Sequence, residues 1–210
     1  MLYPFDDGFR ELVASRCAAF SRLPDSDQTL GLKRAAVAVT LVAAEGSSGE
    51  AAFLLTKRAR SLRQHKGQYA LPGGRIDEGE TPAAAALREL REEVGLELGT
   101  ADVLGTLDDY PTRSGYLITP VVVWAPREAP LRPNPDEVAS VHRIALADIA
   151  RDDAIDFIAI PESERRVIRI RMNGGLVHAP TAAVVYQFHE LLAGRATRVI
   201  DLEQPVFAWK

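Results

Sequence analysis

Three closely spaced glutamates are the residues of this chain best suited to chemistry. Glu89, Glu92 and Glu93 stand at i, i+3 and i+4, so at about 100° per residue their side chains share one face of a helix. Like charges at this spacing repel one another and destabilise a bare helix. A divalent cation would remove that penalty, and a ligand set made only of oxygens favours Mg²⁺ or Mn²⁺ over zinc. The spacing therefore predicts a metal site.

The helix that must position these carboxylates has clear ends in the sequence. Thr81 is expected to be its N-cap, with Pro82 in the first helical position, and Gly95 to terminate it. Arg88 stands one turn before Glu92 and is expected to brace it through an i,i+4 ion pair.

A glycine-rich turn, Pro72-Gly73-Gly74, comes shortly before the helix. Glycine lets the backbone approach a ligand or metal closely. The alternative interpretation is a solvated, salt-bridged surface helix, which is the usual role of a run of Glu and Arg. That interpretation explains the charges, but it does not explain the glycines, the cap and the spacing together.

From Gly74 to Leu96 the sequence GRIDEGETPAAAALRELREEVGL resembles a complete Nudix box. Such a long, gapped match is far more specific than a lone glycine motif. The resemblance implies an α/β protein with the Nudix fold, an α/β/α sandwich around a mixed β-sheet. It also implies metal-dependent hydrolysis of a nucleoside diphosphate linked to another moiety.

The same resemblance implies roles for individual residues of the box. The implied metal ligands are the backbone carbonyl of Gly74 and the carboxylates of Glu89, Glu92 and Glu93. Arg88 resembles the bracing residue, and Glu80 resembles an outer glutamate with a supporting role.

A further carboxylate is expected from the loop 131–137, because Nudix enzymes commonly supply one there as a metal ligand or base. Glu137 resembles that residue, and Asp136 is the second choice. A surface acid at the start of a strand is an equally good interpretation of Glu137. Three glutamates qualify as the general base, and the sequence leaves the choice among them open: Glu89, Glu92 and Glu137.

The segment from Leu54 to Gly74 resembles the signature of the coenzyme A pyrophosphatase branch of the Nudix family. The matching positions are Thr56, Arg58, Ala59, Arg63, Gly67, Pro72, Gly73 and Gly74. Leu71 departs from the signature, which usually has phenylalanine there, and the tryptophan that often precedes a Gly-Leu-Thr-Ala stretch in this branch is absent before Gly175. The resemblance implies that the substrate is bound by Thr56, Arg58, Arg63, His65 and Gly67.

Charge supports a polyanionic substrate. Five Lys or Arg residues fall between Lys57 and Lys66, in a chain whose net charge is −4. Arginine forks beside a carboxylate–metal site would bind the additional phosphate groups of coenzyme A (CoA). A solvated basic loop is the alternative, and Lys57, Arg60 and Lys66 are the members expected to be ordinary surface residues.

The predicted reaction is cleavage of the diphosphate of CoA or acyl-CoA to 3′,5′-ADP and (acyl-)4′-phosphopantetheine. Two alternatives are a Nudix hydrolase of another substrate, such as ADP-ribose, a dinucleoside polyphosphate or NADH, and a non-catalytic Nudix domain that senses a nucleotide. The segment before the box disfavours the first alternative. The intact set of box carboxylates disfavours the second.

Composition sets the remaining expectations. A chain of 210 residues that is 47% hydrophobic predicts a single Nudix domain over residues 1–210. A pI near 5.6 with only one basic cluster disfavours general nucleic-acid binding. The only cysteine, Cys17, is expected in the core. The sequence shows neither a signal peptide nor a membrane span, so a cytoplasmic enzyme is expected. The sequence leaves the oligomeric state open, with a homodimer as one option.

The coarse pattern of apolar residues predicts the elements around the box. An N-terminal helix is expected at about residues 6–22, and a C-terminal helix at about 181–193. Asn173-Gly174-Gly175 is a strong hairpin signal between strands 167–172 and 176–178. The other predicted strands are 35–44, 51–58, 102–110, 117–125 and 138–143, with a short helix at 147–150.

Overall fold

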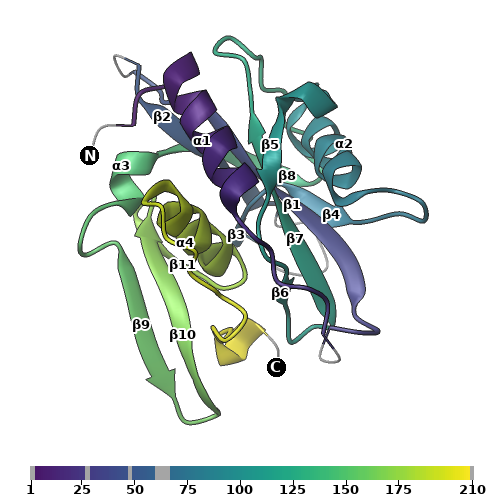
Figure 1. Ribbon diagram of the computed structural model, residues 1–210, viewed down its shortest axis with the longest axis vertical. Helices are drawn as coiled ribbons and strands as arrows, with labels where there is room; N and C mark the ends of the chain where they lie inside the picture. The colour runs from purple at the N-terminus through teal and green to yellow at the C-terminus, as the bar shows by residue number, and fades with distance from the viewer. Residues whose placement is uncertain (1–2, 27–28, 47–48, 60–66, 209–210) are drawn as a thin grey trace.

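The computed structural model describes residues 3–26, 29–46, 49–59 and 67–208. Two sheets form its framework, a mixed sheet of eight strands and an antiparallel sheet of three (Figure 1). The strands of the main sheet are β1 (Lys33–Ala43), β2 (Ala51–Arg58), β3 (Tyr69–Ala70), β4 (Gly73–Arg75), β5 (Val103–Thr106), β6 (Tyr110–Pro111), β7 (Tyr116–Trp124) and β8 (Val138–Ala145). The path through this sheet is β3-β2-β1-β7-β5, with β4 on β1, β6 on β7 and β8 on β2.

Strand β1 is paired with different strands along its length. It runs parallel to β7 and antiparallel to β2, and β2 pairs only with its far end, where Leu41 lies opposite Phe53. Nearer its beginning β1 pairs with β4, where Ala36 lies opposite Gly74. The peptide N–H of Ala38 donates to the carbonyl of Pro72 at 2.8 Å. The Pro-Gly-Gly turn therefore lies within the main sheet rather than at its periphery.

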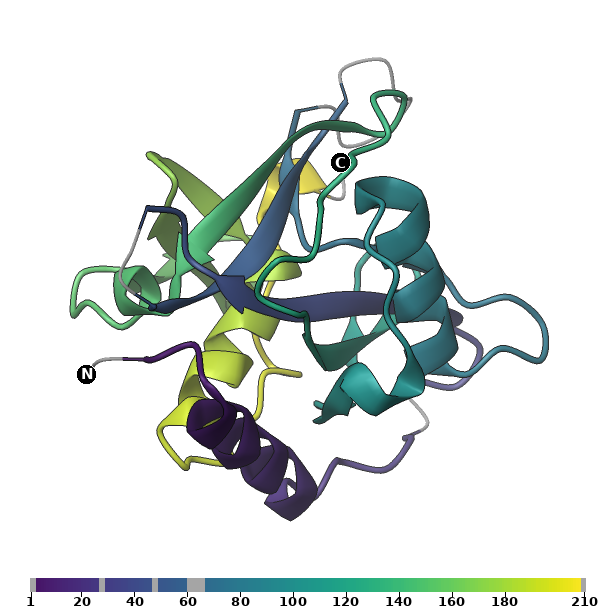
Figure 2. The ribbon, with the colours of Figure 1, turned by 90° about the horizontal axis from the view of Figure 1, so that it is seen from above.

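Side-chain alternation along the strands produces one hydrophobic core on each face of the main sheet. Ala38, Leu54 and Val121 lie on the face that packs against α2 (Pro82–Val94). The neighbouring residues Val39, Phe53 and Val122 lie on the face covered by α1 (Asp7–Ala19), α4 (Thr181–Leu192) and the smaller sheet. Figure 2 shows α2 on one side of the main sheet, with α1 and α4 on the other. The predicted α/β sandwich around a mixed sheet is confirmed.

The helices begin and end close to where the sequence predicts. Thr81 caps α2 by accepting a hydrogen bond from the Ala84 N–H at 3.2 Å, and Gly95 ends this helix in the left-handed region with φ +66°. Helix α1 is shorter than predicted because the chain becomes extended at Phe20. Cys17, on α1, is buried in the core as predicted.

The strand predicted at 102–110 is wrong, because the chain forms two short strands, β5 and β6. Asp108, between these two strands, is buried, and its carboxylate accepts hydrogen bonds from distant parts of the chain. Oδ1 of Asp108 accepts a hydrogen bond from the Leu23 N–H at 2.7 Å, and the guanidinium of Arg198 donates to its Oδ2 at 2.7 Å. These contacts replace the pairing that a continuous strand would have made.

The smaller sheet consists of β9 (Ile155–Ile160), β10 (Ser163–Met172) and β11 (Gly175–His178), in the order β11-β10-β9. The predicted hairpin is present, with Asn173 and Gly174 in its turn at φ +50° and +70°. Strand β9 was not predicted, because its residues are mostly half-buried and show no clear alternation. Its conformation depends on pairing with β10.

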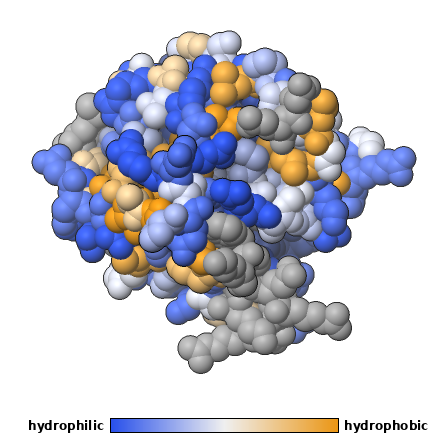
Figure 3. Space-filling view, turned by 90° about the horizontal axis from the view of Figure 1, so that it is seen from below, coloured by the Kyte–Doolittle hydropathy of each residue, from blue (hydrophilic) through white to orange (hydrophobic). Residues whose placement is uncertain are grey.

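The short helix α3 (Leu146–Ile149) follows β8 directly. Among the described helices, none has both the length and the apolar character needed to cross a bilayer. The face seen in Figure 3 intersperses hydrophilic residues with small hydrophobic patches.

Candidate active site

Arg88 is the centre of a network that holds the carboxylates of the box. Its Nε donates to Oε1 of Glu80 at 3.0 Å, and its Nη1 donates to Glu89 at 2.8 Å and to Glu92 at 3.1 Å. Nη2 donates to the carbonyl of Arg75 at 2.8 Å. The expected i,i+4 ion pair with Glu92 is thus one of several contacts of a single guanidinium. This network brings the helix, the loop before it and strand β4 together.

Glu80 supports the network from the loop before α2. Its carboxylate also accepts the Asp77 N–H at 3.1 Å. Hydrogen bonding to Arg88 is the largest influence on Glu80 and lowers its pKa from the ordinary value, so this side chain stays ionised. Glu80 therefore orients Arg88, in keeping with the supporting role expected for it.

Gly74 lies against the carboxylate of Glu89. A Cβ added to Gly74 would be 2.1 Å from Oε1 of Glu89, so the close approach depends on glycine. Burial raises the pKa of Glu89, the hydrogen bond from Arg88 opposes this effect, and the charges of Glu92 and Glu137 add to the increase. The structure thus brings together the Gly74 backbone and the Glu89 side chain, as the metal-site prediction requires.

Glu93 points toward the sheet and is only 4% exposed. Burial is the main reason that its pKa is raised to about 8, and Glu89 and Glu137 add to the increase. A hydrogen bond from the backbone of Gly73 and the positive charge of Arg58 work in the opposite direction. Glu93 is therefore the box carboxylate whose charge depends most on its surroundings.

Arg58 lies at the end of β2, next to Glu93. Its Nη1 is 3.9 Å from Oε1 of Glu93, which makes this a loose ion pair. The Nε of Arg58 is buried and finds no hydrogen-bond acceptor among the described residues. A buried donor without an acceptor is costly, and an anionic ligand at Glu93 would supply the acceptor.

The loop 131–137 docks on the end of α2 through its backbone. The peptide N–H of Arg132 donates to the carbonyl of Val94 at 2.7 Å, and that of Asn134 donates to the carbonyl of Glu93 at 2.9 Å. These bonds bring Glu137 close enough for its charge to raise the pKa of Glu89 and Glu93. The half-buried Glu137 thus joins the carboxylate cluster, whereas Asp136 is exposed.

The other predicted substrate-binding residues have different positions. Thr56 is 2% exposed, and its hydroxyl donates to the carbonyl of Ala70 at 3.0 Å, so the side chain ties β2 to β3. The N–H of Gly67 donates to the carbonyl of Arg58 at 3.1 Å. Arg63 and His65 lie outside the described residues.

The donor set suits a divalent cation with a preference for oxygen ligands. Within the described part of the chain, no group of three His, Cys, Asp or Glu side chains already converges as a ready metal site, and Glu89 and Glu92 are both hydrogen-bonded to Arg88. Glu89, Glu92 and Glu93 nevertheless offer three carboxylates next to the Gly74 backbone. Oxygen ligands of this kind fit Mg²⁺ or Mn²⁺.

Sequence reasoning missed two backbone contributions to the site. The carbonyl of Arg75 accepts from Arg88, and the backbone of Gly73 hydrogen-bonds Glu93. Neither contribution has a sequence signal, because backbone groups carry no side-chain identity. They follow from the pairing of β4 with β1, which fixes the turn beside α2.

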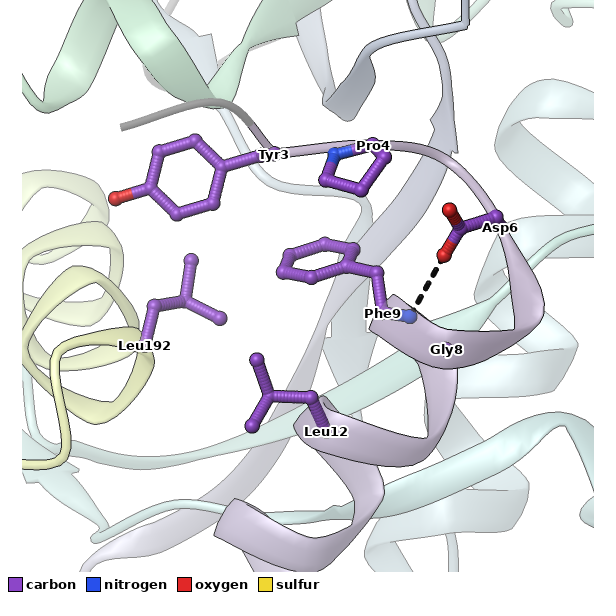
Figure 4. A pocket seen from close by; sticks show the side chains of 7 residues that line it. All are labelled: Tyr3, Pro4, Asp6, Gly8, Phe9, Leu12 and Leu192. Atoms are coloured by element: carbon purple, nitrogen blue, oxygen red, sulfur yellow. Dashed lines mark hydrogen bonds between the residues drawn. The ribbon is translucent and has the colours of Figure 1, made fainter.

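A hollow elsewhere on the molecule is lined mainly by apolar side chains, as Figure 4 shows. Tyr3, Phe9 and Leu12 come from the N-terminal segment and α1, and Leu192 comes from the end of α4. Asp6, at the edge of this hollow, is committed to capping α1 through the Phe9 N–H at 2.8 Å. The predicted site residues do not line this hollow, so it is separate from the carboxylate cluster.

The family model of the NUDIX domain matches residues 32–162, more than half of the chain. This range contains the box, both of its flanking strands and the loop that carries Glu137. The chain therefore belongs to the Nudix family.

Several curated relatives carry the name Uncharacterized Nudix hydrolase NudL. The protein of that name from Cronobacter sakazakii is 41% identical over 127 residues, which are 60% of this chain and 64% of the relative. One from Escherichia coli is 40% identical over 121 residues, 57% of this chain and 61% of the relative. The matched region thus spans less than two thirds of these relatives.

Two solved structures show a weaker similarity to this chain. A MutT/nudix family protein from Enterococcus faecalis has a TM-score of 0.48 and 19% identity, covering 71% of this chain and 54% of that one. An Ap4A hydrolase from C. elegans has a TM-score of 0.49 and 19% identity, covering 78% of this chain and 99% of that one.

Proposed function

We propose that this Nudix protein is a metal-dependent pyrophosphohydrolase that cleaves the diphosphate of CoA or acyl-CoA. Membership of the family, together with relatives named Nudix hydrolase, supports hydrolysis. The observation that carries the substrate proposal is the position of Arg58. This residue belongs to the segment that resembles the CoA pyrophosphatase signature, and its guanidinium lies 3.9 Å from Glu93 with a buried Nε that lacks an acceptor among the described residues. A diphosphate bound beside Glu93 would satisfy that donor.

In the proposed reaction, Glu89, Glu92, Glu93 and the Gly74 carbonyl hold Mg²⁺ or Mn²⁺. The bound cation would polarise the diphosphate and lower the pKa of a water molecule. Arg58 offsets the negative charge of the substrate from the strand side. Arg88 orients two of these carboxylates, those of Glu89 and Glu92.

The general base is a carboxylate of the same cluster. Burial raises the pKa of Glu89, and a carboxylate with a raised pKa is a stronger base toward water than an ordinary one. Glu137 and Glu92 are the alternatives. To distinguish the three, kcat is measured across pH for Glu89→Gln, Glu92→Gln and Glu137→Gln. Loss of the base removes the acidic limb of the pH profile.

The remaining proposals concern the whole protein. We propose a single Nudix domain, a cytoplasmic enzyme with a small-molecule substrate, no nucleic-acid or membrane partner, and either a monomer or a homodimer. Hydrolysis of ADP-ribose or NADH is the nearer alternative function. A non-catalytic nucleotide sensor is the more distant alternative, and the complete carboxylate set disfavours it.

Product identification tests the proposed function. The protein is incubated with CoA, an acyl-CoA, ADP-ribose and NADH in Mg²⁺ and in Mn²⁺, and the products are separated by chromatography. Release of 3′,5′-ADP and 4′-phosphopantetheine, with the highest kcat/KM on CoA or acyl-CoA, is expected. A higher kcat/KM on ADP-ribose or NADH would replace the substrate assignment. No hydrolysis of any of the four would favour the sensor.

A further inference from the structure

The end of α2 depends on the loop 131–137 for hydrogen bonds to its last backbone carbonyls. The last four carbonyls of a helix have no partner within the helix itself. In α2 the N–H of Asn134 donates to the carbonyl of Glu93 at 2.9 Å, and that of Arg132 donates to the carbonyl of Val94 at 2.7 Å. Glu93 and Val94 are both buried. The loop therefore completes the hydrogen bonding of a helix end from which water is largely excluded.

The backbone of Glu137 is fixed on both sides. Its N–H donates to the carbonyl of Asn134 at 3.1 Å, and its carbonyl accepts from the N–H of Ala59 at 2.8 Å. Ala59 follows Arg58 directly, so the second bond ties Glu137 to the end of β2. Glu137 is thus held between the two elements that carry Glu93 and Arg58.

Asn134 is the residue at which these bonds converge. Its N–H binds α2, and its carbonyl accepts from the N–H groups of both Glu137 and Val138, at 3.1 and 2.8 Å. Its side-chain Oδ1 accepts from the N–H of Asp136 at 3.1 Å, a local bond through which asparagine stabilises turns. A proline stands on each side of it in the sequence, and each proline restricts φ. Asn134 therefore connects the helix that carries the box carboxylates to Glu137.

Gly95 leaves the space that this connection needs. It ends α2 at φ +66°, and a Cβ added to it would lie 2.7 Å from both the Cβ and the carbonyl oxygen of Arg132. The carbonyl oxygen belongs to the backbone of the loop, so it cannot rotate aside as a side chain would. Any other residue at this position would push the loop away from α2. Gly95 thus does more than terminate the helix.

We propose that Asn134 and Gly95 are positioning residues for Glu137, an assignment that rests on the proposed function. Asn134 ties Glu137 to α2, and Gly95 lets the loop approach closely enough for that bond to form. Glu137 lies near enough for its charge to raise the pKa of Glu89 and Glu93. Whether Glu137 serves as a ligand or as the base, a displacement of about 1 Å is expected to lower the rate about 100-fold.

Amide hydrogen exchange, measured by NMR, tests the position of the loop without substrate or metal. Gly95→Asn is the variant of choice, because asparagine tolerates positive φ better than most residues, so the substitution mainly introduces the contact with Arg132. The N–H of Ala59 reports on Glu137, to which it is bonded. Its exchange should become at least about ten-fold faster in Gly95→Asn, the value of one lost hydrogen bond.

Two controls show whether the effect is local. Gly31 has φ +82°, and no described atom beyond its chain neighbours lies within 4 Å of a Cβ added to it, so Gly31→Asn introduces the same residue without a contact and should leave exchange at Ala59 unchanged. Leu107, whose N–H bonds the carbonyl of Pro120 at 3.0 Å, reports on the main sheet. Unchanged exchange at Ala59 in Gly95→Asn, or equal acceleration at Ala59 and Leu107, would overturn the proposal.

A double-mutant cycle on kcat tests whether the two residues act through Glu137. Gly95→Asn should lower kcat about ten- to 100-fold in the wild type, but by less than about two-fold when Glu137→Gln is already present. Asn134→Ala removes the acceptor for the Asp136 N–H and should cost less, and Asn134→Ser, which retains an acceptor, should recover part of the loss. Equal losses in the two backgrounds, or wild-type kcat in Gly95→Asn or in Glu137→Gln, would contradict the positioning role.

The same experiments separate this proposal from the proposed function. We measure kcat on whichever of CoA, acyl-CoA, ADP-ribose and NADH the wild type hydrolyses. If ADP-ribose or NADH is the better substrate, the CoA assignment fails and the cycle tests the positioning role on that substrate. If none is hydrolysed, the proposed function fails and hydrogen exchange alone decides whether Asn134 and Gly95 position Glu137. If CoA is cleaved but the cycle is additive, the function stands and the positioning role is wrong.

Discussion

The backbone of Gly74 approaches Glu89 so closely that a Cβ on the glycine would lie 2.1 Å from Oε1 of the carboxylate. The preceding glycine is equally restricted, but by a different neighbour. A Cβ on Gly73 would lie 2.3 Å from the backbone carbonyl oxygen of Ala36. One glycine thus makes room for a flexible side chain of the site, and the other makes room for the sheet.

This difference predicts opposite outcomes for two alanine substitutions. Gly74→Ala should leave the melting temperature within a few degrees of wild type, because Glu89 can swing aside, but kcat should fall about 100-fold through misplacement of the carboxylate. Gly73→Ala should mainly destabilise the protein, because the Ala36 carbonyl is part of β1. Thermal unfolding and kcat are measured for both variants. A Gly74→Ala enzyme with wild-type kcat would show that the position of Glu89 is unimportant.

Removing single charges from α2 should inactivate the protein without unfolding it. Glu92→Gln and Glu93→Gln preserve side-chain shape, and each removes a proposed metal ligand. We expect kcat to fall about 1000-fold or more at saturating metal, the scale expected for loss of a strong charge stabiliser. Glu97→Gln, which lies beyond the end of α2, is the control and should retain activity. More than a tenth of wild-type turnover in both test variants would remove these residues from the metal site.

Arg58→Ala should weaken the hydrolysis of CoA and of dephospho-CoA equally. The Arg58 guanidinium faces Glu93, so it is placed to serve the diphosphate that both substrates share. We expect kcat/KM to fall about ten- to 100-fold on each, the value of one charge-assisted contact. A loss confined to CoA in Arg58→Ala would instead assign Arg58 to the 3′-phosphate.

The carboxylate of Glu203 should make a pH-dependent contribution to the free energy of unfolding. Its carboxylate is 3% exposed and accepts hydrogen bonds from Arg113 Nε at 3.0 Å and from Ser163 Oγ at 2.8 Å. The bond to Arg113 is the main reason that the pKa of Glu203 falls from 4.5 to about 2. Because the pKa is lower in the folded state, the contribution is complete above about pH 4.5 and is lost as the pH falls toward 2.

Glu203→Gln should therefore lower the free energy of unfolding by about 1–3 kcal/mol at neutral pH, and this difference should shrink as the pH falls from about 4.5 toward 2. Urea unfolding across that range measures it. Asp153→Asn is the control, since Asp153 and its partner Arg151 are 64% and 65% exposed and such pairs contribute little. If the difference in free energy of unfolding between wild type and Glu203→Gln stays constant with pH, the ionised carboxylate of Glu203 is not its source.

The local features of the box helix follow from sequence alone. Thr81, Pro82 and Gly95 determine where α2 begins and ends, because capping and left-handed termination are properties of single residues within one turn. The i,i+4 contact of Arg88 with Glu92 follows from helical spacing. The Asn173-Gly174 turn is equally local, since both residues tolerate positive φ.

Contacts between elements that are distant in sequence could be identified only from the tertiary structure. The spacing of Glu93 does not reveal its burial next to Arg58, nor does the Asn173 turn reveal contact with Tyr69. Both depend on β3 and β4 filling the space between β1 and β2, and on the smaller sheet packing beside them. Sequence thus determined the residue types and the local helix and turn geometry, because these depend on neighbouring residues. Long-range packing, which no local pattern encodes, decided which side chains form ion pairs and hydrogen bonds with one another.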